Sequence, residues 1–206
     1  PYQIVVDMDG VITPHPLEPS EGFQNAAQST LLGSTIGNFW QWAYSDLVGN
    51  TDRGALAEFI VAKAIDDASP TRNAWEPYDL TTASGIKVEV KSASFAQSWH
   101  QKQPTRVQFL IKKTMEWDPR TNEFLAPASR HSDVYVFCLL AEMVKESLNP
   151  LDLEQWEFYV LSTKQIDRDF GDLQSISLKQ VKDRSRCHPV DKLFEAISQV
   201  LNKPGD

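Results

Sequence analysis

The segment 86–92 alternates apolar and polar side chains without a break, as Ile-Lys-Val-Glu-Val-Lys-Ser. Successive side chains of a β-strand point to opposite faces of the sheet, so the alternation predicts a strand with one apolar and one polar face. The three apolar side chains are expected to pack into the core. Glu89 and Lys91 then lie close together on the opposite face, together with Lys87.

A second strand, predicted for residues 78–82, precedes this one. Ala83-Ser84-Gly85 between them is typical of a hairpin turn. Asp79 stands ten residues before Glu89 in the sequence. A hairpin of this length brings the two carboxylates side by side, with Lys91 as their neighbour.

A helix is predicted for residues 55–67, with Asp52 as a candidate N-cap. From Ala55 to Ile65 only Glu58 and Lys63 are charged, so the helix is apolar nearly all round, as buried helices are. A carboxylate on such a helix needs a polar partner or a metal ion. The alternative, that Glu58 lies on a narrow stripe facing solvent, stays open.

The chain of 206 residues fits one domain of the α/β or α+β class, with a central mixed sheet flanked by helices. We expect an N-terminal decoration at 1–50, a catalytic core at 51–163 and C-terminal helices at 164–206. Further strands are predicted at 106–112, 133–140 and 156–162. Further helices are predicted at 163–169, 177–183 and 190–201.

The net charge of −8 argues against a nucleic-acid partner until its distribution is considered. Residues 87–131 hold eight Lys or Arg and four Asp or Glu, so this segment carries +4 and the remainder −12. It could form a local phosphate-binding surface or a solvated loop, and composition favours neither. Its candidate phosphate contacts are Arg106, Lys112, Lys113, Arg120 and Arg130; Trp99, His100 and Lys102 are further candidates for stacking and charge.

Asp79, Glu89 and Lys91 are the residue types that hydrolysis of a phosphodiester requires. Two carboxylates hold Mg²⁺, which prefers oxygen ligands, and the ion activates both a water molecule and the phosphoryl group. A lysine beside them orients the water or stabilises developing charge. The alternative is a half-exposed strand with a surface ion pair, because Glu-x-Lys alone is a common pattern.

These segments together resemble the PD-(D/E)xK restriction-endonuclease-like nuclease superfamily, and in particular a group of uncharacterised bacterial proteins. The resemblance covers most of residues 35–200. It is carried by the runs Arg53-Gly-Ala-Leu-Ala-Glu58, Trp75-Glu-Pro-Tyr-Asp79-Leu, Gly85-Ile-Lys-Val-Glu89-Val-Lys91-Ser and Gln97-Ser-Trp99, followed by Arg130-His-Ser-Asp133 and Trp156-Glu-Phe-Tyr-Val-Leu-Ser-Thr163.

The resemblance implies an αβββαβ core and Mg²⁺-dependent cleavage of DNA, with Mn²⁺ as a substitute ion and RNA not excluded as a substrate. Asp79, Glu89 and Glu58 would be metal ligands and Lys91 the catalytic lysine. Gln97, or less fittingly Gln103, would assist the site. Tyr78-Asp79 stands where the superfamily has Pro-Asp. Because many of these nucleases cut both strands as dimers, a homodimer is a further expectation.

Two other functions compete with this interpretation. Ile4-Val-Val-Asp7-Met-Asp9-Gly10 resembles the first motif of haloacid dehalogenase-like phosphatases, in which Asp7 would be the nucleophile and Asp9 the general acid/base. The βαβ units that this fold needs after the motif are not evident in residues 14–76. The other alternative is a nuclease-like module that binds nucleic acid without cutting it.

The remaining features suggest a cytoplasmic protein without a membrane span. The longest apolar runs, such as 134–141, are too short to cross a bilayer, and no signal peptide is visible. Cys138 and Cys187 provide no disulfide framework. Cys187-His188 is too small a cluster for a zinc site, which needs three or four ligands.

Overall fold

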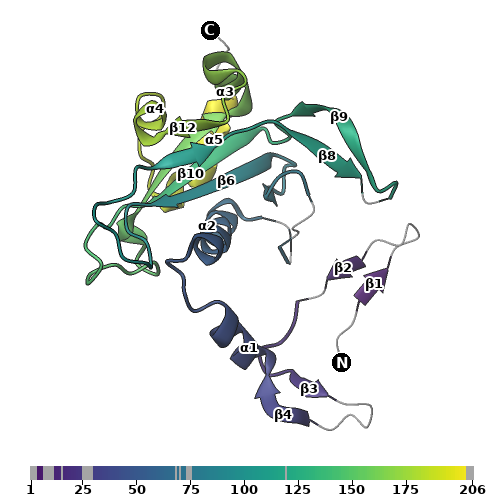
Figure 1. Ribbon diagram of the computed structural model, residues 1–206. Coiled ribbons are helices and arrows are strands. Elements are labelled where there is room, and N and C mark those ends of the chain that lie inside the picture. The colour runs from purple at the N-terminus through teal and green to yellow at the C-terminus, as the bar shows by residue number, and fades with distance from the viewer. Residues whose placement is uncertain are drawn as a thin grey trace.

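The computed structural model describes residues 4–6, 12–14, 16–24, 30–67, 69, 71–72, 76–118 and 120–202 (Figure 1). Its helices are α1 (Ile36–Ala43), α2 (Asn50–Ile65), α3 (Thr163–Phe170), α4 (Leu178–Lys182) and α5 (Leu193–Leu201), with 3-10 turns at Leu153–Gln155 and Val190–Lys192. Its strands are β1 (Ile4–Val6), β2 (Ile12–Pro14), β3 (Gly22–Gln24), β4 (Thr30–Thr35), β5 (Leu80–Thr81), β6 (Lys87–Ser94), β7 (Gln108–Leu110), β8 (Thr114–Asp118), β9 (Glu123–Ser129), β10 (Val134–Leu140), β11 (Trp156–Ser162) and β12 (Ser175–Ser177).

A four-stranded sheet in the order β11-β10-β6-β5 forms the centre of the molecule. β6 runs parallel to β10, whereas β10–β11 and β5–β6 are antiparallel pairs. Asp133 joins the two parallel strands at their start, because its amide donates to the Lys87 carbonyl and its Oδ2 accepts from the Lys87 amide. The expected mixed sheet flanked by helices is therefore confirmed.

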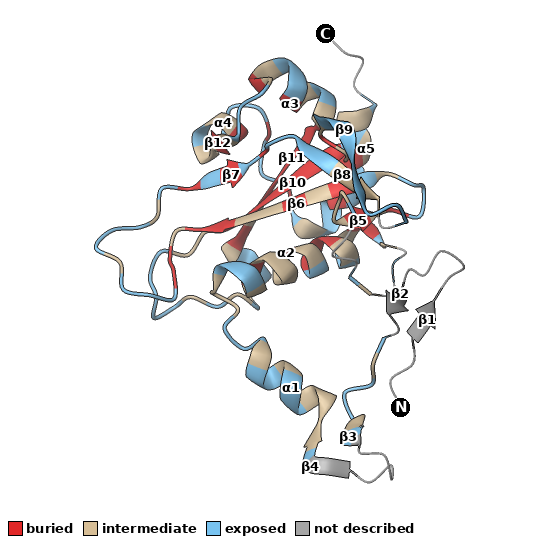
Figure 2. Ribbon diagram, turned by 45° about the vertical axis from the view of Figure 1, so that its right-hand side comes forward, coloured by how far each residue is buried: buried red, intermediate tan, exposed pale blue. Residues whose placement is uncertain are grey.

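Helices and small strands cover both faces of this sheet (Figure 2). On one face α2 and α5 bury a core that includes Val61, Val88, Val136 and Ile197. On the other face α3, α4, β7 and β12 bury a second core around Phe109, Phe137, Leu161, Ile166 and Val181. Every residue of β10 is buried, which explains its continuous apolar sequence, since a strand covered on both faces needs no polar alternation.

Several local features differ from what the sequence predicts. Residues 106–112 supply only the short β7, which pairs with β12 and not with the central sheet. Between β7 and β10 the chain forms the β8–β9 hairpin. α2 begins at Asn50 with Gly49 as its N-cap, so Asp52 lies inside the first turn and does not cap the helix. Phe59 is exposed on α2, so this helix is not buried all round.

The N-terminal region forms the β1–β2 and β3–β4 hairpins and α1, which lie apart from the sheet (Figure 1). Thr35 caps α1, and none of its residues is buried; Trp42 is the most exposed of its aromatic side chains. Asp7 and Asp9, the candidate phosphatase residues, lie outside the described residues. Within the described part of the chain, no helix has the length and apolar character needed to span a membrane.

Candidate functional site

The β5–β6 hairpin places Asp79 against β6, as the sequence predicts. Gly85 adopts a φ of +85° in the turn, a backbone conformation that favours glycine, and its amide donates to the Thr82 carbonyl. The register pairs Leu80 with Val88, and the Asp79 amide donates to the Val88 carbonyl at 3.1 Å. Oδ2 of Asp79 accepts a hydrogen bond of 2.7 Å from the Val90 amide. The Asp79 carboxyl is thus fixed beside the Val88–Val90 stretch that carries Glu89.

The carboxyls of Asp79 and Glu89 are electrostatically coupled. Burial, and next to it the charge of Glu89, raises the pKa of Asp79 to about 7, and the charge of Glu58 adds a smaller increase. The Val90 amide and the charge of Lys91 act in the opposite direction but are weaker. Two carboxylates that repel each other in a partly buried place are a common feature of functional sites.

Lys91 forms an ion pair with Oε1 of Glu89 on the polar face of β6. Their side chains are 29% and 17% exposed, so the pair is more enclosed than most surface pairs. Lys87, the third polar residue of the strand, points its ammonium at the ring of Tyr78, 4.8 Å from the ring centroid. Glu89 and Lys91 are therefore paired with each other on this strand, whereas Lys87 is directed at Tyr78.

Glu58 has a different partner. Its carboxylate is bound by both Nε and Nη2 of Arg72, with 2.9 Å between Nη2 and Oε1. Its side chain is 12% exposed, so the polar partner expected for a carboxylate on this helix is present, and it is a cation. The hydrogen bond with Glu58 raises the pKa of Arg72 most, and the charges of Glu58 and of Asp79 raise it further. Glu58 lines a hollow of about 160 Å³ together with Asp79.

Gln97 is buried in the loop that follows β6. Its Nε2 donates to the Ser94 carbonyl at 3.1 Å and to Oγ1 of Thr105 at 3.4 Å, whereas Oε1 has no partner among the described residues. Gln97 and Lys91 line one cavity, which does not include Asp79 or Glu89. Gln103, the weaker candidate, is exposed. The structure thus brings Gln97 near Lys91 and leaves it apart from the two coupled carboxylates.

The donor set suits a hard divalent cation with few protein ligands. In the described part of the chain, no three His, Cys, Asp or Glu side chains are grouped to hold a metal ion. Asp79 and Glu89 each use one oxygen in a hydrogen bond or ion pair, and no described residue donates to Oδ1 of Asp79 or Oε2 of Glu89. Mg²⁺ is commonly bound by one or two carboxylates and keeps several waters, so these two residues fit it without Glu58.

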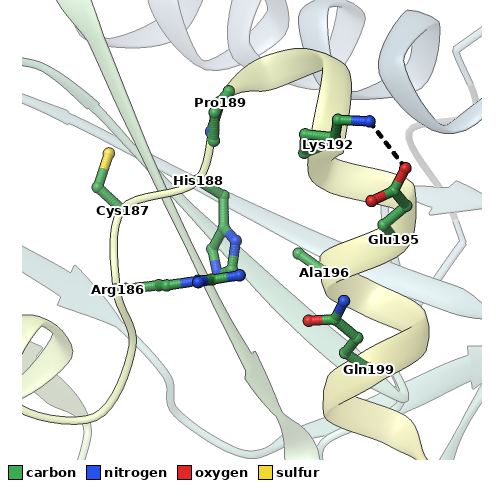
Figure 3. Close-up of a pocket in the computed structure, with 8 residues that line it drawn as sticks. All are labelled: Arg186, Cys187, His188, Pro189, Lys192, Glu195, Ala196 and Gln199. Atoms are coloured by element: carbon green, nitrogen blue, oxygen red, sulfur yellow. Dashed lines mark hydrogen bonds and ion pairs between the residues drawn. The ribbon is translucent and has the colours of Figure 1, made fainter.

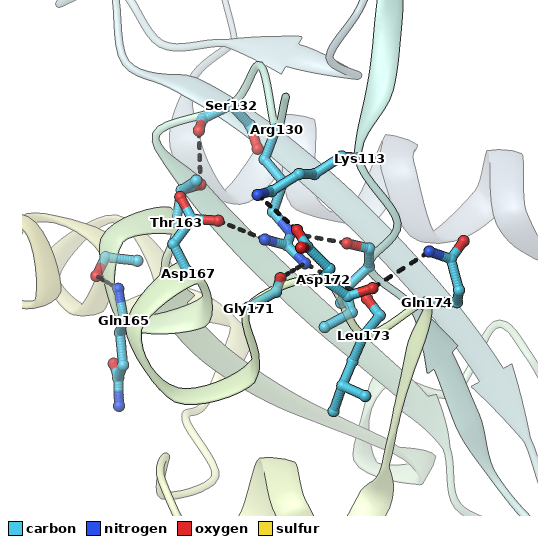
Figure 4. Close-up of polar contacts among 12 residues, drawn as sticks. Lys113, Arg130, Ser132, Thr163, Gln165, Asp167, Gly171, Asp172, Leu173 and Gln174 are labelled. Atoms are coloured by element: carbon cyan, nitrogen blue, oxygen red, sulfur yellow. Dashed lines mark hydrogen bonds and ion pairs between the residues drawn. The ribbon is translucent and has the colours of Figure 1, made fainter. Parts of the chain in front are cut away.

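Arg130, a candidate phosphate contact in the sequence, is part of the interior instead (Figure 4). Its guanidinium is fully buried and pairs with Asp167. It also donates to the carbonyls of Ile111 at 2.7 Å and Gly171 at 2.9 Å. Ile111 follows β7 and Gly171 follows α3, so Arg130 links these two segments. It also supplies donors to carbonyls that would otherwise be buried without them. Lys113 pairs with Asp172 beside this network.

Cys187 and His188 lie at a pocket beside α5 (Figure 3). The sulfur of Cys187 points away from the imidazole of His188 in this view. Cys187 is exposed, whereas His188 is buried and its amide donates to the Phe158 carbonyl. Cys187 and His188 thus differ in exposure and do not point toward each other in this view.

Two residues at these sites were not predicted from the sequence. Arg72 lies fourteen residues after Glu58, beyond the end of α2, and no pattern marks it as a partner. Arg53 begins the stretch that resembles a nuclease helix, but its burial follows from tertiary packing.

No protein-family model matches this chain, and a search of curated proteins finds no relative.

Proposed function

We propose that this protein is a Mg²⁺-dependent nuclease, most simply a DNA endonuclease, with its site at Asp79, Glu89 and Lys91. The observation that carries the proposal is the coupling of the Asp79 and Glu89 carboxyls across the β5–β6 hairpin, with Lys91 paired beside them. Such a site gains from a bound divalent cation, since the cation neutralises the repulsion that raises the pKa of Asp79.

Each residue then has a distinct part in the reaction. Asp79 and Glu89 would hold the ion through their remaining oxygens, and the bound ion would supply Lewis-acid polarisation of the phosphoryl group. Asp79 must lose its proton to do so, and a pKa of about 7 places this change near neutral pH. Lys91 supplies N–H donors and positive charge where the phosphate becomes more negative. Arg72 keeps Glu58 paired. Glu58 then acts through its charge, which raises the pKa of Asp79 slightly.

The choice of DNA and of a restriction-endonuclease-like core rests on the sequence resemblance. The order helix α2, hairpin β5–β6 and later strands β10 and β11 is compatible with that superfamily, whereas the short β7 and the β8–β9 hairpin depart from its αβββαβ pattern. The surface near Lys91 supports an anionic substrate, because Lys91 and the exposed Arg106 line one cavity.

The test is nicking of supercoiled plasmid and cleavage of single-stranded DNA with Mg²⁺ or Mn²⁺, against a chelator. Glu89→Gln and Lys91→Ala are each expected to lower the rate about a hundredfold or more. Matched controls are Glu195→Gln and Lys192→Ala, which break the exposed ion pair of α5 seen in Figure 3 and are expected to cut normally. Cleavage that survives both β6 substitutions would refute the proposed site.

The phosphatase alternative receives no support from the described strands. β1, which would carry the nucleophile at its end, pairs antiparallel with β2 in a separate two-stranded sheet. In a doubly wound fold this strand would lie inside a parallel sheet. Hydrolysis of a small phosphate ester that is lost in Asp7→Asn would restore that alternative.

A further inference from the structure

A cavity of about 380 Å³ lies beside Lys91, where β6 runs into the loop 95–107. This volume is within the range of about 300–1,000 Å³ usual for small-molecule sites. Its walls come from the first turn of α2, the second half of β6, the following loop and β7. The lining residues that matter most are Asn50, Arg53, Lys91, Gln97, Trp99 and Arg106.

The charged residues that line this cavity are all basic, and one of them, Lys91, is paired with Glu89. Among the described residues that line it there is no Asp or Glu, whereas Arg53, Lys91 and Arg106 contribute three cations. The chain as a whole has a net charge of −8, so a wall of this kind is unlike its average surface. An occupant with negative charge is therefore favoured.

Arg53 is a buried cation that pairs with no carboxylate among the described residues. Its side chain donates to the Val48 carbonyl at 2.8 Å and to Oδ1 of Asn50 at 2.7 Å, and the residue is only 3% exposed. No described carboxylate pairs with it, and burial lowers its pKa. Its Nε–H is buried and has no acceptor among the described residues. A buried charge of this kind is costly unless another group pairs with it.

Gln97 lines the same cavity and has a buried acceptor that lacks a donor among the described residues. The residue is 5% exposed, and its Nε2 is occupied by Ser94 and Thr105. Its Oε1 is a buried acceptor without a donor in the described part of the chain. Two residues that line the cavity thus hold, among the described residues, a buried unpaired donor on a cation and a buried unpaired acceptor on an amide. A ligand that completes both needs an anionic group and a hydrogen-bond donor.

We propose that this cavity binds one nucleotide unit of the substrate strand, with its phosphate on Arg53 and Arg106 and a hydroxyl or amino group on Oε1 of Gln97. Trp99, which is 54% exposed at the rim, offers a face on which the base stacks. Lys91 lines the cavity on one side and pairs with Glu89 on the other, so the bound unit lies next to the scissile phosphate. This inference rests on the proposed function, because it names the strand position that the nuclease site would hold.

The experiment measures binding without cleavage, in a chelator, with a short fluorescein-labelled single-stranded oligodeoxynucleotide. Arg53→Met is expected to weaken binding about tenfold, since one charge-assisted contact is lost. Arg106→Met, at an exposed position where folding is not at risk, is expected to weaken it severalfold. Lys179→Met removes an equal charge from α4, where Lys179 pairs with Asp183, and is expected to bind like the native protein. If Arg53→Met does not fold, Arg106→Met decides the test.

Competition by unlabelled probes identifies the ligand chemistry. A mononucleotide is expected to displace the oligonucleotide from the native protein more strongly than inorganic phosphate, because only the nucleotide also reaches Gln97 and Trp99. Equal competition by the two would overturn the nucleotide assignment. Equal weakening by Lys179→Met, or native affinity in both arginine variants, would overturn the site itself. The nuclease proposal fails separately, through absence of metal-dependent cleavage or through cleavage that survives Glu89→Gln and Lys91→Ala.

Discussion

Two buried arginines, Arg53 on α2 and Arg130 between β9 and β10, have very different surroundings. Arg130 pairs with Asp167 and donates to the carbonyls of Ile111 and Gly171 (Figure 4). Arg53 donates to one carbonyl and one amide oxygen, and it has no carboxylate partner among the described residues. A buried cation whose donors are satisfied holds a fold together, whereas one left without a counter-ion suggests a missing ligand.

The same contrast extends to the acids. Asp167 has Arg130 as its partner, but Asp79 faces a second carboxylate and has a raised pKa. Among the described residues, Arg53 and Asp79 therefore have no ion-pair partner, whereas Arg130 and Asp167 are paired with each other. Arg53 and Asp79 lower the stability of the fold at the proposed site, whereas the contacts of Arg130 raise it elsewhere.

The largest loss of stability is expected for Arg130→Met. The substitution leaves the Ile111 and Gly171 carbonyls without their donor and removes the pair with Asp167, so the free energy of unfolding should fall by about 3 kcal/mol. Urea denaturation followed by circular dichroism measures this change. A variant as stable as the native protein would show that Arg130 does not hold the segment after β7 to α3.

Asp79→Asn is expected to stabilise the protein in a chelator at pH 8 by about 2 kcal/mol. Folding raises the pKa of Asp79 from 3.8 to about 7, so the folded state prefers the protonated carboxyl. Native stability therefore falls as the pH rises from about 4 through about 7, and the asparagine variant avoids this loss. Denaturation at several pH values checks the prediction. A gain of equal size at pH 4 and pH 8 would contradict it.

The sequence predicted the parts of the fold that depend on local pattern. The alternation in 86–92, the Gly85 turn and the apolar run of β10 each specify an element and its exposure, so the sheet and the Asp79–Glu89 neighbourhood could be foreseen. β7 was predicted too long and without its partner, because β12 has the polar sequence Ser-Ile-Ser and pairs only through tertiary contact. Propensity alone does not specify such a strand.

The candidate site was predicted less completely than the fold. Glu58 was expected to need a partner, but Arg72 lies fourteen residues away, and pairing at that distance is a tertiary property. Arg130 looks like a surface cation in the sequence and is fully buried. Arg53 is likewise buried, and its Nε has no acceptor among the described residues; both properties depend on how β6, β7 and α2 are assembled.

A smaller change in stability is expected for Arg53→Met. The substitution loses the contacts to Val48 and Asn50 but also removes a buried charge, so the free energy of unfolding should stay within about 1 kcal/mol of the native value. A saturating mononucleotide is expected to raise the urea midpoint of the native protein and not that of the variant. A loss as large as that of Arg130→Met would make Arg53 a structural arginine and remove the contrast between the two.

The smallest effect is expected for Lys113→Ala, at the edge of the Arg130 network. Lys113 pairs at 2.8 Å with Asp172, whose side chain is 88% exposed, so water replaces the lost ion pair and the urea midpoint should not move. Asp172 stands between Gly171 and Leu173, the two residues whose carbonyls accept from Nη2 of Arg130. A measurable loss in Lys113→Ala would therefore mean that this surface pair holds the acceptors of Arg130 in place. The balanced network would then extend to the surface, and the energy attributed to the buried guanidinium would be shared with Lys113.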